Sequence, residues 1–221
     1  MLADPRLLTA GPVNGNAAPS RRGRMTSAQR RAAIAAAALR LFSERGFRGT
    51  TTRELAAAVG VTEPVLYEHF KSKRDLYRVI IEAKSEEGRE RAGALLAPYT
   101  ERNDDRGFFG TMAALLLERY VQEPEYARLL LHLAVEGDEL AGLFYQRQIL
   151  AYHKLVASYI ARRVRHGAFR PIDPALAARA FLSMPVHHSM LRLFFQDQFV
   201  KSSNKRIAEE MATIFLGGVC A

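Results

Sequence analysis

Residues 50–73 constrain the fold of this chain more than any other stretch, because they predict two short helices joined by a tight corner. Thr51 or Thr52 can cap the first helix, since a side-chain hydroxyl in front of a helix accepts an otherwise unpaired backbone N–H. Apolar residues then recur at helical spacing, as expected for one buried face. Gly60 follows at the position where a left-handed backbone is least costly, so we expect the first helix to end there.

The second helix of the corner is short and has one inward face. Thr62 stands at its capping position, and Pro64 lies in its first turn, where the missing N–H removes no hydrogen bond. Leu66 and Phe70, four residues apart, are predicted to face inward. Many proteins present a helix to the DNA major groove from such a corner. The residues left for the outward face are Thr62, Glu63, Val65, Tyr67, Glu68 and His69.

Three consecutive segments of this region resemble the DNA-binding domain of the TetR family of bacterial transcriptional regulators. They are residues 42–47 (FSERGF), 50–58 and 61–73, and the resemblance is densest over the run LYEHFKSK at 66–73. It covers about residues 27–80, whereas the remainder matches the family only in length and helical character. Hydroxyl, imidazole and cationic side chains bind phosphate, and arginine also reads a guanine edge. The expected DNA-binding residues, from the resemblance and from the two lysines after the corner, are Arg53, Thr62, Glu63, Pro64, Tyr67, His69, Lys71 and Lys73.

The positive charge of the chain is concentrated in the same part. The net charge is +9 over 221 residues. Residues 1–80 hold 14 Lys/Arg and 6 Asp/Glu, a net +8, whereas residues 81–221 are close to neutral. An excess of cations around a helix-turn-helix is what attraction to DNA phosphates requires.

The rest of the chain shows helical periodicity and no strand pattern, so we expect an all-α protein of about nine helices. Residues 1–25 predict a disordered basic tail, because they are rich in Pro, Gly, Asn and Arg and lack periodicity. Residues 26–73 predict the three-helix DNA-binding head, and residues 74–221 a larger helical domain for effector binding and dimerisation. A linking helix from about residue 73 into 82–91 joins the two, and further helices are expected over about 104–121, 124–137, 139–166, 173–196 and 203–217.

The larger helical domain contains aromatic, methionine and polar residues that suit a ligand pocket. The resemblance implies that it binds a small effector molecule. A mostly apolar lining with a few polar groups is typical of such pockets, although an ordinary core has the same composition. The candidate effector-binding residues are Met112, Tyr126, Phe144, Gln148, Tyr152, Phe181, Met184 and His187.

The last two predicted helices carry more apolar surface than the end of a monomer usually needs. The resemblance implies a homodimer, and a two-fold dimer would place two recognition helices about 34 Å apart on a near-palindromic operator. The candidate interface residues are Leu191, Phe195, Ile207, Met211, Ile214 and Phe215.

Other classes of site find little support in the sequence. Adjacent His187 and His188 point about 100° apart on a helix, so they do not chelate together easily, and we expect neither a metal nor a cofactor. No catalytic triad, phosphate-binding glycine loop or paired carboxylates emerge, so an enzyme is not expected. The single cysteine, Cys220, fits a reducing cytoplasm, and no apolar run is long enough to span a membrane.

The sequence therefore predicts a ligand-responsive, sequence-specific transcriptional regulator, more readily a repressor than an activator. Its partners would be double-stranded operator DNA, a small-molecule effector and a second copy of the chain. Two alternatives stay open: an architectural helical DNA-binding protein without an effector, and a helical small-molecule-binding or catalytic bundle.

Overall fold

The computed structural model describes residues 26–136, 139–197 and 199–220. Within these ranges the regular structure is helical, apart from one isolated β-bridge between Phe169 and Cys220. The all-α prediction is confirmed. The predicted disordered tail over residues 1–25 lies outside the described residues.

Nine helical rods make up the described part of the chain, because three of the helical segments continue one another. The segments are α1 (Ser27–Arg45), α2 (Thr52–Ala58), α3 (Glu63–His69), α4 (Lys73–Arg102), α5 (Asp105–Gln122), α6 (Pro124–Glu136), α7 (Glu139–Phe144), a π-helical turn η1 (Tyr145–Ile149), α8 (Leu150–Arg165), α9 (Pro174–Phe195) and α10 (Asn204–Val219). The rod α7–η1–α8 corresponds to the single long helix that was expected over 139–166.

The starts of the first helices follow from their caps. The hydroxyls of Thr26 in front of α1 and Thr51 in front of α2 each accept a backbone N–H. The side-chain oxygen three positions on accepts the backbone N–H of the cap residue in return. Ser72 caps α4 by accepting the Asp75 N–H. Such caps satisfy N–H groups that the helix itself leaves unpaired. Gly60 has φ +69°, the left-handed conformation expected between α2 and α3.

Two helices run further than the sequence pattern indicated. α4 continues past residue 91 and through Pro98 to Arg102, and Leu96 in this extension is buried against α5. α10 continues through the glycine pair at 217–218 to Val219, which is also buried. Tertiary packing therefore outweighs the low helix propensity of Pro and Gly at these positions.

The described residues pack around two hydrophobic cores. The body core joins α4, α5, α8, α9 and α10 and contains Phe109, Phe181 and Phe215, whose rings contact one another. The head core joins α1–α3 to the first half of α4, and it also receives Leu129 and Leu133 from α6. The core of the DNA-binding head therefore extends beyond residue 73 into the larger helical domain.

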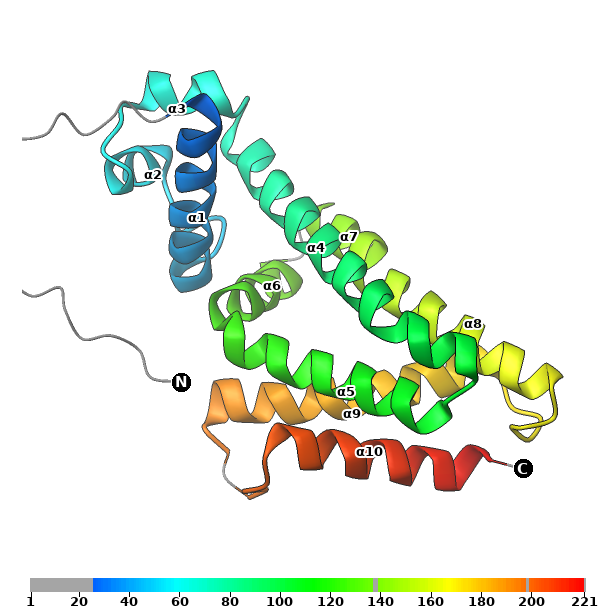
Figure 1. The fold of residues 1–221 in the computed structure, drawn as a ribbon. Helices are drawn as coiled ribbons and strands as arrows, with labels where there is room; N and C mark the ends of the chain where they lie inside the picture. Colours follow the sequence, from blue (N-terminus) through cyan, green and yellow to red (C-terminus); the bar gives the residue numbers. More distant parts are fainter. Residues whose placement is uncertain (1–25, 137–138, 198, 221) are drawn as a thin grey trace, which may run out of the picture.

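Figure 1 shows how these cores are connected. Helices α1–α3 gather at one end, α4 runs from them along the molecule, and α5, α9 and α10 form the far side. The middle of the molecule holds α6, which packs alongside α1 and also contacts α5. Helices α4 and α6 thus connect the head to the body, and α7 also packs against the head core through Leu140.

Candidate functional site

Helix α3 presents one face to solvent, as its sequence indicated. Leu66 is fully buried in the head core, whereas Tyr67 is 46% exposed. The structure also exposes Thr62 and Pro64, and it leaves Glu63 and His69 half-buried. Two further candidates, Arg53 on α2 and Lys71 after α3, are exposed near this face and can reach a ligand outside the protein.

The end of α3 is held by Arg31, a residue of α1 that the sequence did not single out. Its guanidinium donates from Nη1 to the His69 carbonyl oxygen and lies 4.2 Å from the centre of the Phe70 ring. The contact spans 38 residues, so no local pattern announces it. Arg31 fixes the C-terminal end of α3 relative to α1.

Glu63 makes its main contact within the protein. Its carboxylate accepts a hydrogen bond from the Thr52 hydroxyl at 2.6 Å, which ties the first turn of α3 to the first turn of α2. This bond fixes the angle of the corner. Glu63 therefore has a structural contact in addition to its expected place beside DNA.

Lys73 has a structural environment that differs from that of the other candidate DNA contacts. Its ammonium group donates to the carbonyl oxygens of Phe47 and Thr50, both at 2.8 Å. Burial lowers the pKa of this ammonium, and the carboxylate of Glu136 opposes the change. Lys73 thus binds the loop between α1 and α2. It is half-buried there, whereas Lys71 is exposed.

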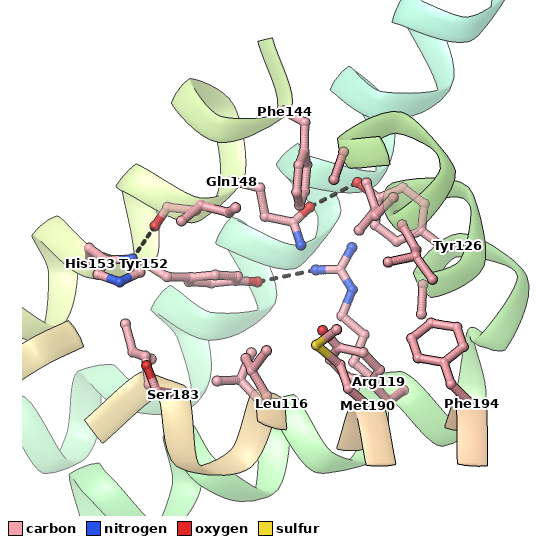
Figure 2. A pocket seen from close by; sticks show the side chains of 18 residues that line it. Leu116, Arg119, Tyr126, Phe144, Gln148, Tyr152, His153, Ser183, Met190 and Phe194 are labelled. Atoms are coloured by element: carbon pink, nitrogen blue, oxygen red, sulfur yellow. Dashed lines mark hydrogen bonds between the residues drawn. The ribbon is translucent and has the colours of Figure 1, made fainter. Parts of the chain in front are cut away.

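A cavity of about 300 Å³ lies in the body between α5, α6, the rod α7–η1–α8 and α9 (Figure 2). Its lining is mostly apolar. The lining residues are Leu116, Arg119, Tyr120, Tyr126, Ala127, Leu130, Leu131, Ala134, Phe144, Gln148, Ile149, Tyr152, His153, Leu182, Ser183, Val186, Met190 and Phe194.

Gln148, from the π-helical turn, is the most buried polar group of the pocket. Its side-chain oxygen accepts from the Tyr126 hydroxyl at 2.8 Å and from the Ser85 hydroxyl at 3.3 Å. Burial raises the pKa of Tyr126 to about 12, so its phenol remains a donor at neutral pH. π-Helical turns occur often at functional sites, and here the turn carries the polar centre of the cavity.

Arg119 forms the second polar group of the pocket. Its Nε donates to Glu123 at 3.2 Å, one terminal nitrogen to the Tyr152 hydroxyl at 3.2 Å, and the other to the Lys84 carbonyl oxygen at 2.9 Å. Glu123 also pairs with the Lys84 ammonium at 2.5 Å. Each of the three guanidinium nitrogens thus donates a hydrogen bond to the protein.

Four of the eight candidate effector residues line this cavity: Tyr126, Phe144, Gln148 and Tyr152. The other four do not line it. Met112 and Phe181 are fully buried in the body core, Met184 packs against that core, and His187 is exposed. On α9 the pocket takes the face with Ser183, Val186, Met190 and Phe194, which the sequence analysis missed although they recur at helical spacing.

The candidate dimer residues divide between surface and core. Phe195 is 76% and Ile214 67% exposed, whereas Leu191 and Met211 are half-buried. Ile207 and Phe215 are buried in the body core of the same chain. An interface on α9 and α10 therefore has Phe195 and Ile214 available for contact.

Neither a metal centre nor a membrane span emerges from the described residues. They contain no group of three or more His, Cys, Asp or Glu side chains arranged to hold a metal ion. None of their helices is long and apolar enough to cross a membrane.

Two family models match the chain, one over each of these sites. The model described as "Bacterial regulatory proteins, tetR family" matches residues 34–80, which include the corner of α2 and α3. The model described as "AefR-like transcriptional repressor, C-terminal domain" matches residues 112–218, which include most of the pocket.

Individual proteins agree with these matches. The chain is 30% identical over 155 residues to the HTH-type transcriptional regulator TtgR of Pseudomonas putida, which covers 66% of this chain and 71% of that protein. Among solved structures, the TetR-family regulator PfmR from Thermus thermophilus has a TM-score of 0.65 at 24% identity over 87% of this chain and 97% of its own. AibR in complex with isovaleryl coenzyme A and operator DNA has a TM-score of 0.58 at 20% identity over 84% and 97%. The chain belongs to the TetR family of bacterial transcriptional regulators.

Proposed function

We propose that this chain is a ligand-responsive repressor that leaves its operator when a small molecule fills the pocket described above. The exposed face of α3, with Tyr67, Lys71 and Arg53 of α2 nearby, would enter the major groove and contact the flanking phosphates. The cavity favours this proposal over an architectural DNA-binding protein, which needs no ligand site.

The observation that carries the proposal is the position of α6. One side of this helix lines the pocket with Leu130, Leu131 and Ala134. Another side, with Leu129 and Leu133, lies in the head core next to α1. A ligand that displaces α6 must therefore move its packing against the head.

Linkage then converts ligand binding into release of DNA. A ligand that binds more tightly to the arrangement with displaced heads lowers the affinity for the operator. By reciprocity, operator DNA lowers the affinity for the ligand by the same factor. To shift the repressor from mostly bound to mostly free, the binding free energies of the ligand for the two arrangements must differ by several kcal/mol. The AibR complex supports the proposal, because a protein of the same fold has been seen with both a small molecule and operator DNA.

A homodimer is part of the proposal. Phe195 on α9 and Ile214 on α10 are large apolar side chains left exposed, and such groups favour a protein interface. Two copies related by a two-fold axis would present two α3 helices to successive major grooves. We propose that this dimer acts in the cytoplasm, as a binding protein and not as an enzyme.

The test is a titration of the DNA upstream of its own gene, followed by fluorescence anisotropy over a series of salt concentrations. We expect tighter binding to this DNA than to random DNA of equal length, with affinity that falls steeply with salt. Equal affinity for both DNAs would contradict the proposal. An Ile214→Asp variant, which we expect to be monomeric by sedimentation, tests whether the operator requires two heads.

A further inference from the structure

Gln148 presents an unused hydrogen-bond donor to the interior of the pocket. Its side-chain oxygen is taken by the hydroxyls of Tyr126 and Ser85. Among the residues that the structure describes, its amide nitrogen makes no hydrogen bond. Figure 2 shows this nitrogen directed into the cavity, on the side of Arg119 and Tyr152. A donor that faces the cavity without a protein partner is available to a ligand acceptor.

The orientation of this amide is fixed by its neighbours. Tyr126 is fully buried, and its phenol is a better donor than acceptor, so it holds the oxygen of Gln148 towards itself. The Ser85 hydroxyl on α4 supports the same oxygen. Both hydroxyls bond the amide oxygen, so the amide nitrogen lies on the cavity side of the group (Figure 2).

The charged groups of the pocket are already paired within the protein. All three nitrogens of the Arg119 guanidinium donate to protein atoms, and Glu123 neutralises its charge. Lys84 is held by Glu123 and Glu87, at 2.5 and 3.0 Å. A carboxylate or ammonium in the apolar part of the cavity would lose its hydration without gaining an ionic partner.

We infer that the pocket takes an uncharged, predominantly apolar molecule with one oxygen acceptor, such as a ketone or ether, which receives a hydrogen bond from the Gln148 amide nitrogen. The inference rests on the proposed function, since it names the class of effector for the same pocket. The cavity of about 300 Å³ stands at the small end of the range for organic ligands.

Three probes of one shape test the inference by calorimetry on the full chain without DNA: 2-acetylnaphthalene, 2-ethylnaphthalene and 2-naphthoate. We expect the ketone to bind about tenfold more tightly than the hydrocarbon, since a neutral hydrogen bond contributes up to that factor. The carboxylate should bind most weakly at pH 7. Tightest binding of the carboxylate would overturn the inference, and so would a lack of binding by all three probes.

Two variants then test whether Gln148 causes the preference for the ketone over the hydrocarbon. Gln148→Met keeps the length of the side chain and removes its donor, so the ketone and hydrocarbon should bind within about twofold of each other. Gln148→Leu also removes the donor, and it covers the case in which the Met variant fails to fold. Gln146→Met, the same change at an exposed position of the same turn outside the pocket lining, should keep the full preference. Survival of the preference in either Gln148 variant would overturn the inference.

A parallel titration of the operator complex separates this inference from the proposed function. Release of DNA by the ketone in wild type, and not in Gln148→Met, supports both. Binding of the ketone through Gln148 without release of DNA leaves the inference intact and contradicts the repressor mechanism. Release that is equal for all three probes supports the mechanism and contradicts the role of Gln148.

Discussion

The ammonium nitrogen of Lys73 lies 2.8 Å from the carbonyl oxygen of Phe47 and 4.2 Å from the centre of the Phe47 ring. One cation thus holds both the backbone and the side chain of the residue that follows α1. The contact joins the start of α4 to the loop in front of α2, and it distinguishes Lys73 from the exposed Lys71 two positions earlier.

We expect Lys73→Met to destabilise the fold by about 2 kcal/mol, because hydrogen bonds from a charged donor contribute about that much and the two carbonyl groups would lose their partner. The measurement is urea unfolding followed by circular dichroism. At a temperature where the variant is folded, the salt dependence of its DNA binding should match wild type. A reduced salt dependence with unchanged stability would show instead that Lys73 contacts phosphate.

Lys71→Ala should change the salt dependence of DNA binding and leave stability unchanged, the reverse of Lys73→Met. Its side chain is exposed, so we expect unchanged stability. If the ammonium binds a phosphate, the slope of log affinity against log salt should fall by about one, and operator and random DNA should lose affinity alike. Anisotropy titrations at four salt concentrations measure this slope, and an unchanged slope would remove Lys71 from the interface.

Gly88 on α4 allows the polar group around Arg119 to form. A Cβ atom at this position would lie 2.2 Å from Nη1 of Arg119 and 2.7 Å from the Tyr152 hydroxyl oxygen. We expect Gly88→Ala to destabilise the protein by about 1–3 kcal/mol through overpacking, and to weaken ligand binding.

The matched control is Gly93→Ala on the same helix, where a Cβ would meet nothing within 4 Å. Alanine has the higher helix propensity, so this variant should be more stable by up to about 1 kcal/mol. Thermal unfolding of Gly88→Ala and Gly93→Ala measures the two changes in stability. Equal stabilisation by the two substitutions would show that Arg119 and Tyr152 move aside without cost.

Tyr126 makes stability depend on pH in the alkaline range. Its pKa is about 12 in the folded protein and 10 for the free side chain, so the contribution is fully present below pH 10. Above pH 10 the unfolded chain loses its proton first, and stability falls by about 1.4 kcal/mol per pH unit up to pH 12. Unfolding of wild type and Tyr126→Phe between pH 9 and 11 should show the smaller decline in the variant. Parallel curves of stability against pH for the two proteins would show that Tyr126 is not the cause of the decline.

The head could be predicted from the sequence because its signals are local. The capping hydroxyl of Thr51, the left-handed Gly60 and the inward Leu66 each act within a few residues. Contacts across long stretches of sequence gave no such signal. Arg31 at the end of α3, and Lys73 on the loop after α1, could not be recognised before the helices were placed.

The pocket could be predicted only in part, because neighbouring residues on one helix face different surroundings. Phe181 lies in the body core, whereas Ser183, about 200° further around α9, lines the cavity. Composition cannot choose between these faces, since aromatic residues suit both. Gln148 was among the candidates because ligand pockets combine an apolar lining with a few polar groups.

The two faces of α6 also limit how such a protein can diversify. Leu130 and Leu131 line the pocket one and two positions after Leu129, which packs in the head core. A substitution on this helix that adapts the pocket to a new ligand will therefore tend to alter DNA affinity as well. Residues on the α9 wall of the pocket, such as Ser183 and Met190, do not belong to the head core. New ligand specificities should arise most readily on that wall, where selection can act on recognition alone.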